Sequence, residues 1–333
     1  MPSKANPAPE LTVVVPVFNE AANIGELVRR LAAALATCVA SFEIVFVDDG
    51  SSDGTLAALC AARDADPRVD AISFSRNFGK EVAIAAGLDH ARGRAVVIID
   101  ADLQHPPEVI PAMIAKWREG YENVYGQRTD RMGDAPLRRA LTRRFYTLFE
   151  QFGETPLPPG AGDFRLLDRK AVNALLRMRE RARFSKGLYA WIGFKSIGVP
   201  FAVAERANGA SKFSYGKLTR FALDGLTSFS TLPLKVWTFI GMTISFFALT
   251  ATAYFIARTM MSGVDVPGYA SLIVSVMFFA GVQLLSLGVI GEYIGRIFAE
   301  VKGRPLYIVA RHLSVDEQEL RIDSQQGMGR AAE

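Results

Sequence analysis

Two long uncharged runs near the C-terminal end of the chain constrain its fold most. No charged residue occurs at positions 236–257 or 266–291. A helix needs about 20 apolar residues to cross the hydrocarbon core of a bilayer, and a buried core helix of a soluble protein is hardly apolar over such a length. The sequence therefore predicts two transmembrane helices, at about 236–258 and 268–292, and they explain a positive mean hydropathy of +0.17.

The charges that flank these runs predict their orientation. Basic residues gather on the two outer flanks, whereas the short connecting loop carries one arginine and one aspartate. Because basic residues favour the cytoplasmic side, we expect a multi-pass protein of the inner or plasma membrane whose large N-terminal part and both termini are cytoplasmic. The flanking basic residues are Lys212, Lys217, Arg220 and Lys235 before the first run, and Arg296, Lys302, Arg304 and Arg311 after the second.

The N-terminal part of the chain alternates short apolar runs with helical stretches. Runs at 11–18, 43–49, 69–75 and 95–100 predict buried strands, and a fifth is expected at 123–127. Short connections between strands and helices predict a doubly wound, mostly parallel α/β sheet. Ligands of such sheets bind beyond the carboxyl ends of the strands. Four polar motifs follow strands here, namely PVFNE, DDGSSDGT, SRNFGKE and DADLQHPPE.

Asp100 and Asp102 end the fourth predicted strand. Residues two apart on an extended chain project to the same side, and two carboxylates placed so repel each other without a partner. Mg²⁺ or Mn²⁺ prefers such oxygen ligands and can neutralise a departing nucleoside diphosphate. We therefore predict a metal site at Asp100 and Asp102. A capping or turn role for one aspartate is the alternative, and His105 is either a further ligand or a loop residue.

Other charged residues allow two interpretations each. Asp48 and Asp49 end the second strand, where they can bind a base or a ribose or shape a turn. Lys80 either faces phosphate or is a surface cation, and Asp163 either stands near the reacting centre or belongs to a turn. Lys212 either meets a lipid phosphate or anchors the chain at the headgroups. No GxGxxG follows the first strand and no Walker A motif occurs, which argues against dinucleotide oxidoreductases and P-loop enzymes.

In this order the motifs resemble glycosyltransferase family 2, in the polyisoprenyl-phosphate branch that is similar to dolichyl-phosphate mannose synthase and the bacterial polyprenyl-phosphate glucosyltransferases. Each motif alone is only moderately specific, but the ordered set covers nearly the whole chain. The matching segments are VPVFNE (15–20), VDDGSSDGT (47–55), SRNFGKE (75–81), IDADLQHPPE (99–108), GQR (126–128), GDFRL (162–166), KGLYAWIGF (186–194), ERANGASKFSYGKL (205–218), DGLTSFSTLPL (224–234) and IGEYIGRIFAEVKGRPLYIV (290–309).

The resemblance implies a GT-A catalytic domain with a Rossmann-like, mostly parallel sheet, and with the two apolar runs it suggests a domain plan. A disordered N-terminus at 1–10 precedes the GT-A domain at 11–205. A juxtamembrane amphipathic segment is expected at 206–234, followed by the two transmembrane helices within 235–293. The remaining residues, 294–333, are expected to form a cytoplasmic C-terminal tail.

The resemblance also implies roles for individual residues. Those expected to bind the nucleotide sugar are Pro16, Asn19, Glu20, Asp48, Asp49, Lys80, Asp100, Ala101 and Asp102, of which Asp100 and Asp102 also hold the metal. Those expected at the acceptor phosphate are Arg128, Arg206 and Lys212. Those expected to take part in catalysis are Asp102, Arg128, Asp163 and Arg165.

The implied reaction is the inverting, metal-dependent transfer of one sugar to a polyisoprenyl phosphate, with UDP-glucose and undecaprenyl phosphate as the first choices. Mannose, N-acetylglucosamine and aminoarabinose remain open, and the absence of a QxxRW motif favours a single transfer. Alternatives are a membrane-tethered transferase with a non-lipid acceptor and a non-catalytic scaffold that binds lipid phosphate. The formal net charge of +4 fits nucleic acid, anionic lipid or a phosphate-rich substrate; the resemblance favours the last two, without nucleic acid, and a homo-oligomer such as a tetramer.

Overall fold

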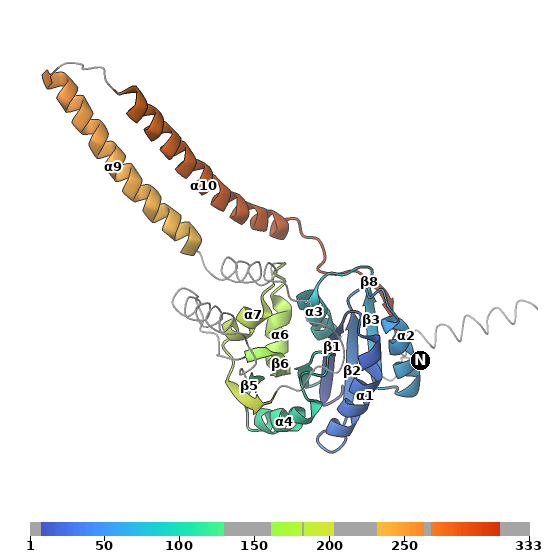
Figure 1. Ribbon diagram of the computed structural model, residues 1–333. Coiled ribbons are helices and arrows are strands. Elements are labelled where there is room, and N and C mark those ends of the chain that lie inside the picture. The colour runs from blue at the N-terminus through green and yellow to red at the C-terminus, as the bar shows by residue number, and fades with distance from the viewer. Residues whose placement is uncertain (1–7, 130–160, 182, 203–231, 263–267, 314–333) are drawn as a thin grey trace, which may run out of the picture.

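The protein consists of an α/β unit from which two long helices project (Figure 1). The computed structural model describes residues 8–129, 161–181, 183–202, 232–262 and 268–313. The expected disordered N-terminus therefore lies largely outside the described residues, as do most of the juxtamembrane segment and the chain beyond residue 313.

Within these residues, eight strands form one sheet in the order β7-β5-β6-β4-β1-β2-β3-β8. β1 pairs in parallel with β2 and β4, β2 with β3, and β5 with β7. β6 runs antiparallel to β4 and β5, and β8 runs antiparallel to β3. The predicted α/β class with a mostly parallel sheet is confirmed. The strands are β1 Leu11–Val17, β2 Phe42–Asp48, β3 Val69–Phe74, β4 Ala95–Ile98, β5 Asn123–Arg128, β6 Ala161–Asp168, β7 Ser196–Phe201 and β8 Val309–His312.

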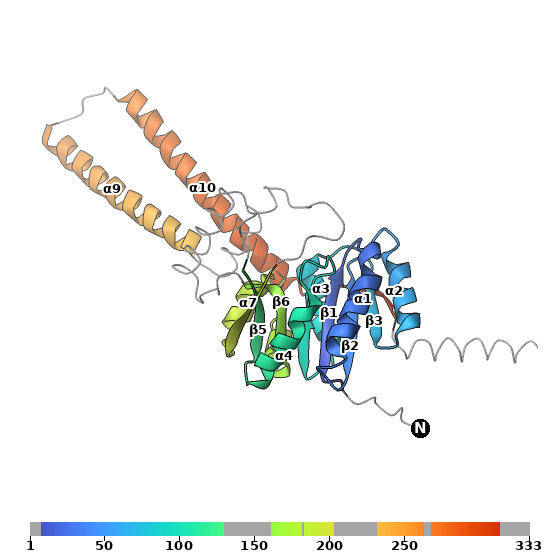
Figure 2. The ribbon, with the colours of Figure 1, turned by 60° about the horizontal axis from the view of Figure 1, so that its bottom comes forward.

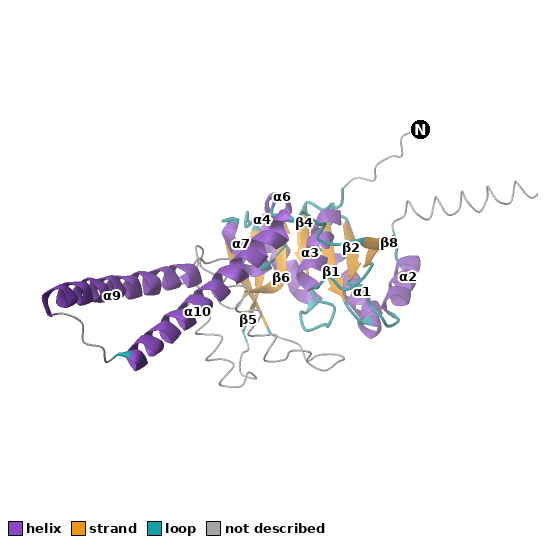
Figure 3. Cartoon of the chain, turned by 90° about the horizontal axis from the view of Figure 1, so that it is seen from above, coloured by secondary structure: helices purple, strands orange, loops and turns teal. Residues whose placement is uncertain are grey.

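Helices cover both faces of the sheet (Figure 2 and Figure 3). On one face, Leu27 of α1 and Met113 of α4 pack with Val13 of β1. On the other face, Leu88 of α3 packs with Val14 in a core that α6 and α7 join. Cover on both faces explains why the strands are apolar runs rather than alternating patterns. The helices of the unit are α1 Ala21–Leu35, α2 Thr55–Ala65, α3 Lys80–His90, a short 3₁₀ turn Pro107–Val109, α4 Ile110–Arg118, α6 Arg169–Arg177 and α7 Ser185–Trp191.

The two long helices are α9 (Leu232–Ser262) and α10 (Tyr269–Val301). The first predicted span lies within α9, and α10 begins one residue after the predicted start of the second span. Several of their large apolar side chains, among them Phe247 and Phe278, are exposed. In the described part of the chain, one stretch, Phe278–Val301, is long and apolar enough to cross a membrane. A transmembrane segment of two helices therefore remains a prediction.

After α10 the chain returns to the sheet and adds β8 to its edge. The N–H of Ser75 donates to the carbonyl oxygen of Ile308 over 3.0 Å. The ring of Tyr307 stacks on Phe74 with a centroid separation of 5.0 Å, and its hydroxyl donates to Asp89 over 2.9 Å. This strand lies within the segment expected to be a tail. Its four residues are too few to show a strand pattern, and its partner is far away in sequence.

Replacing Tyr307 with alanine is expected to lower the free energy of unfolding by about 2 kcal/mol, because the variant loses the ring contact and the hydrogen bond that fasten β8. Ile308→Ala is the matched control, since the Ile308 side chain is 55% exposed while its backbone makes the strand contact. Thermal unfolding of both variants in detergent measures the difference. Equal unfolding temperatures would contradict a fastening role for Tyr307.

Candidate active site

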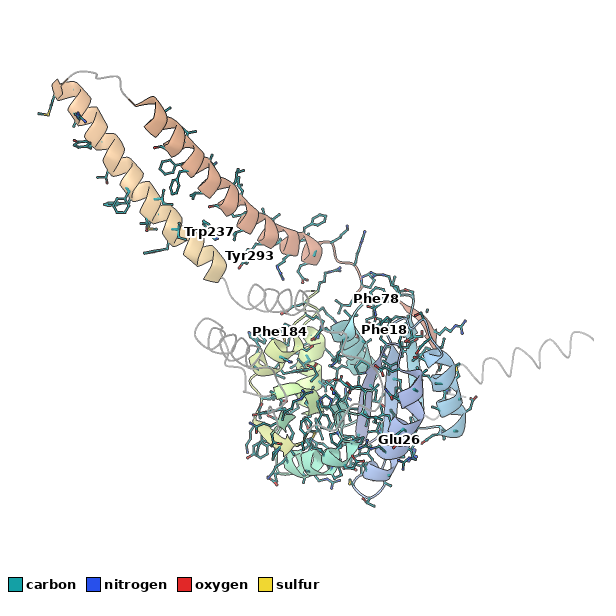
Figure 4. All side chains as sticks on the ribbon, in the orientation of Figure 1. Phe18, Glu26, Phe78, Phe184, Trp237 and Tyr293 are labelled. Carbon is teal, nitrogen blue, oxygen red and sulfur yellow. The ribbon has the colours of Figure 1, made fainter. Side chains whose placement is uncertain are left out.

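The polar motifs meet at the edge of the sheet where the parallel strands β1, β2, β3 and β4 have their carboxyl ends. Figure 4 shows Phe18, which follows β1, and Phe78, which follows β3, at the end of the α/β unit nearer to α9 and α10. Glu26 on α1 lies lower in the same view, away from that end. The expected binding edge is thus the edge that faces the long helices.

Lys80, Asp100 and Asp163 form a charge cluster at this edge. The Nζ atom of Lys80 lies 2.6 Å from Oδ1 of Asp100 and 3.1 Å from Oδ2 of Asp163. The antiparallel register of β4 and β6 pairs Ile98 with Arg165. Continuing that register by two residues places Asp100 opposite Asp163, and Lys80 reaches both from the first position of α3.

Asp48 and Asp49 bind the protein's own backbone and hydroxyl groups. The carboxylate of Asp49 is buried and accepts the N–H of Phe78 over 2.6 Å and that of Gly79 over 2.9 Å. Asp48 accepts the hydroxyl of Ser73 over 2.8 Å. The two aspartates thereby tie the loop after β2 to β3 and to the loop that delivers Lys80.

Hydrogen bonds also join the loop after β1 to the loop after β2. The N–H of Asn19 donates to Oγ of Ser51 over 2.9 Å, and Oδ1 of Asn19 accepts the N–H of Ser52 over 2.9 Å. The N–H of Glu20 donates to Oγ1 of Thr55 over 3.0 Å. The loops that carry the residues expected around the nucleoside are therefore joined to one another by hydrogen bonds.

Arg165 is buried behind the charge cluster. Its guanidinium lies 3.6 Å from the ring centre of Tyr189 and donates to the carbonyl oxygen of Gly162 over 2.6 Å. A further contact, 3.3 Å long, reaches Oδ1 of Asn123. Burial lowers the pKa of Arg165, although the charge of Asp163 opposes that shift. Through these contacts Arg165 fastens the part of β6 that carries Asp163 to β5 and α7.

Comparison with known proteins identifies this arrangement. Residues 12–176 match the model of the family described as Glycosyl transferase family 2. The uncharacterized glycosyltransferase sll0501 of Synechocystis sp. is 48% identical over 301 residues, which cover 90% of this chain and 95% of that protein. The chain belongs to glycosyl transferase family 2. It is a glycosyltransferase, and the resemblance to the polyisoprenyl-phosphate branch is confirmed by relatives of about 44% identity that are named bactoprenol glucosyl transferases.

Two further similarities complete the comparison. The SfII prophage-derived bactoprenol glucosyl transferase of Shigella flexneri is 44% identical over 302 residues, 91% of this chain and 98% of that protein. Among solved structures, mannosyl-3-phosphoglycerate synthase from Rubrobacter xylanophilus is 18% identical with a TM-score of 0.47, over 66% of this chain and 72% of that chain. The second similarity is too low to add to the family assignment.

The charges of the cluster in this glycosyltransferase stabilise one another. Partial burial lowers the pKa of Lys80, but the carboxylates of Asp100 and Asp163 outweigh it and raise that pKa. Burial likewise opposes the charge of Asp163, but Lys80 and then Lys186 hold the pKa of this carboxyl well below its usual range. Asp163 is thus a firmly ionised carboxylate and a weak base.

The residues of this family 2 enzyme that could hold a metal are Asp100, Asp102 and His105. Oδ1 of Asp102 accepts the N–H of Gln104 over 3.1 Å. His105 is buried, its ring stacks on Phe164 at 5.1 Å, and its Nδ1 lies 3.6 Å from Oδ2 of Asp100. This Nδ1 has no hydrogen-bond partner among the described residues. Burial, with Arg128 and Lys80 nearby, lowers the pKa of His105 against the opposing charge of Asp100.

These donors fit a divalent cation that also takes ligands from a substrate. The three side chains do not form a ready-made metal site, since no group of three or more His, Cys, Asp or Glu among the described residues is placed to hold an ion by itself. Two carboxylates and one neutral imidazole nitrogen therefore do not complete a shell. Mg²⁺ is commonly bound through one or two carboxylates together with substrate phosphates, and this donor set suits that mode.

Of the remaining predicted residues, three lie in the described part of the chain and two lie outside it. Pro16 is buried in β1 opposite Val47, Ala101 is buried beside Asp100, and Arg128 is exposed at the end of β5. Arg206 and Lys212 lie outside the described residues. The structure therefore brings together Lys80, Asp100 and Asp163, whereas the predicted acceptor-phosphate set stays a prediction.

Glu81 and Ser185 of the glycosyltransferase were not predicted to take part in the site. An oxygen of Glu81 accepts both the N–H of Ser185, over 3.1 Å, and its hydroxyl, which ties α7 to α3. Burial raises the pKa of Glu81. Both residues lie in or next to motifs of the family resemblance, SRNFGKE and KGLYAWIGF. That position is the only signal in the sequence, because the contact itself joins residues 104 positions apart.

Proposed function

We propose that this glycosyltransferase transfers one sugar, with glucose from UDP-glucose as the first choice, to a polyisoprenyl phosphate such as undecaprenyl phosphate. The observation that carries the proposal is the extent of the similarity to the bactoprenol glucosyl transferase of Shigella flexneri. It covers 302 of 333 residues and so extends well beyond the α/β unit, which would suffice for nucleotide-sugar chemistry alone.

The arrangement of the long helices supports a lipid acceptor. Both the beginning of α9 and the end of α10 lie toward the α/β unit (Figure 1), and β8 fastens the chain after α10 to the sheet. A pair of helices that leaves and returns on one side would place the active site at one membrane face. With the basic flanks, we propose that both helices span the membrane and that the α/β unit is cytoplasmic.

The proposed reaction is an in-line displacement with inversion. An oxygen of the lipid phosphate attacks the anomeric carbon of the sugar, the bond from that carbon to the diphosphate oxygen breaks, and UDP leaves with the bonding electrons. A phosphate monoester is already anionic near neutral pH, so no general base is required. Asp163, which is ionised and paired with Lys80, is suited to positioning rather than to proton removal.

The chain's own residues would bring two anionic substrates together. Asp100 and Asp102 would hold a Mg²⁺ or Mn²⁺ ion, which neutralises the diphosphate when bound. Lys80 adds a positive charge beside the same edge, and Arg128, Arg206 and Lys212 are proposed to hold the acceptor phosphate. Proximity and charge complementarity are then the main sources of rate enhancement. A GT-A assignment of the domain accords with the family and with the carboxylates at the end of β4.

The first test measures UDP release by the purified full chain with UDP-glucose, Mg²⁺ or Mn²⁺, and undecaprenyl phosphate. Release that requires both the lipid and the metal is expected. Release without lipid, or with a water-soluble acceptor in its place, would favour a membrane-tethered transferase. Silence with UDP- and GDP-sugars in the presence of lipid would contradict the proposal and favour a non-catalytic scaffold. The mass of the protein in detergent tests the further proposal of a homo-oligomer.

A further inference from the structure

Lys80 is shared between two carboxylates that the reaction uses differently. Asp100 belongs to the proposed metal site. Asp163 lies on the neighbouring strand β6 and is proposed to position the substrates without binding the metal. We propose that Lys80 is a positioning residue that gives up Asp100 to the divalent cation and then pairs wholly with Asp163. Metal binding would thereby move one positive charge across the site. This inference rests on the proposed function only for the identity of the metal site.

The backbone that carries Lys80 is fixed, so the exchange concerns its side chain alone. The carboxylate of Asp49 holds the N–H groups of Phe78 and Gly79, directly before Lys80. Gly79 has a φ of +101°, a left-handed conformation that favours glycine at this turn. The Lys80 side chain, by contrast, is 43% exposed, and its four-carbon stem is flexible. Its ammonium group can therefore move between two acceptors without any change in the loop.

A cation bound at Asp100 would disfavour the present position of Lys80. The ammonium already occupies Oδ1 of Asp100 at 2.6 Å, and the other oxygen, Oδ2, faces His105. A divalent ion on Oδ2 would lie within a few ångströms of the ammonium, and like charges at such a separation repel strongly. The repulsion falls when the ammonium leaves Asp100.

Asp163 is ready to receive the whole ammonium. Its Oδ2 is already 3.1 Å from Nζ of Lys80. Its Oδ1 is buried and has no hydrogen-bond partner among the described residues, so it can accept one. The Asp163 side chain is only 16% exposed, and the neighbouring Phe164 and Arg165 are buried, which keep the carboxylate in place. The structure thus contains both the departure point and the receiver of the exchange.

The test measures the affinity of the full chain in detergent for Mn²⁺ alone, by electron paramagnetic resonance, without nucleotide or lipid. Lys80→Met removes the competitor for Asp100 and is expected to tighten Mn²⁺ binding about tenfold, the size of effect seen for charged groups in contact. Lys116→Met is the matched control, because Lys116 near the end of α4 pairs with the exposed Glu119 that follows the helix, and its loss should leave the affinity unchanged. Unchanged or weaker binding by Lys80→Met overturns the proposal. If that variant does not fold, Lys80→Gln carries the same expectation.

A double-mutant cycle separates the exchange from a general effect of charge. Asp163→Asn removes the receiver, so it should weaken Mn²⁺ binding about tenfold when Lys80 is present and much less in the Lys80→Met background. Equal weakening in both backgrounds would show a through-space effect only and overturn the exchange. If the wild-type protein binds no Mn²⁺, the proposed metal site fails as well, which distinguishes the two failures.

Discussion

Replacing Asp102 with asparagine is expected to lower the rate of sugar transfer about a thousandfold, because the variant loses one of the two carboxylates proposed to hold the cation at the diphosphate. Asparagine has the same shape, and its Oδ1 can still accept the N–H of Gln104, as that of Asp102 does over 3.1 Å. The loss is therefore one of charge and not of loop structure. Initial rates with UDP-glucose and undecaprenyl phosphate measure it.

Asp64→Asn is the control for this experiment, since Asp64 is exposed near the end of α2 and away from the strand ends. It should retain the wild-type rate. Binding of UDP in the presence of Mn²⁺ should weaken in Asp102→Asn and not in Asp64→Asn. An Asp102→Asn enzyme with full activity would refute the metal site at the end of β4.

Replacing Gly50 with alanine is expected to lower the free energy of unfolding by about 3 kcal/mol. Gly50 has a φ of +69°, and a Cβ atom there would lie 2.5 Å from the carbonyl carbon of Arg76. The strain of a left-handed alanine and the clash of its Cβ with the Arg76 backbone would therefore both destabilise the folded state. Because Asp49 next to it ties this loop to the one that carries Lys80, the substitution should also weaken UDP binding.

Gly54→Ala is the matched control within the same motif. Gly54 has a φ of −72°, and a Cβ atom there would come no closer than 3.8 Å to the nearest side chain. Denaturant unfolding should separate the two variants, with Gly54→Ala close to the wild type. If Gly50→Ala were as stable as Gly54→Ala, the contact between the two loops would be looser than the structure shows.

Strands β1 to β5, the carboxylate pair and the long helices could be predicted because each is encoded in neighbouring residues, whereas β6, β7 and β8 were not predicted. β1, for example, is a run of seven buried residues of which all but Thr12 are apolar. Asp100 and Asp102 stand at a strand end, where a doubly wound sheet binds its ligands. The apolar runs of α9 and α10 are recognisable by length and lack of charge alone.

The roles of single residues were harder to predict. The carboxylate of Asp49 accepts two backbone N–H groups of the next loop, a contact that the motif did not reveal, and its expected place at the nucleoside stays a prediction. The guanidinium of Arg165 is buried against Tyr189, and the expected part of Arg165 in catalysis stays a prediction. A motif shows that a charged residue belongs near the site, whereas the partner of that charge depends on which loops and strands lie beside it.

The sequence by itself determined the class of sheet, the edge at which the polar motifs gather and the family, because these follow from local periodicity and ordered motifs. Only the tertiary structure decided that Lys80 lies between Asp100 and Asp163, and that β8 closes the sheet beside β3. Both depend on strand order and register. Residues 83 positions apart, such as Lys80 and Asp163, meet only when β6 inserts antiparallel between β4 and β5, and no local pattern encodes that neighbour.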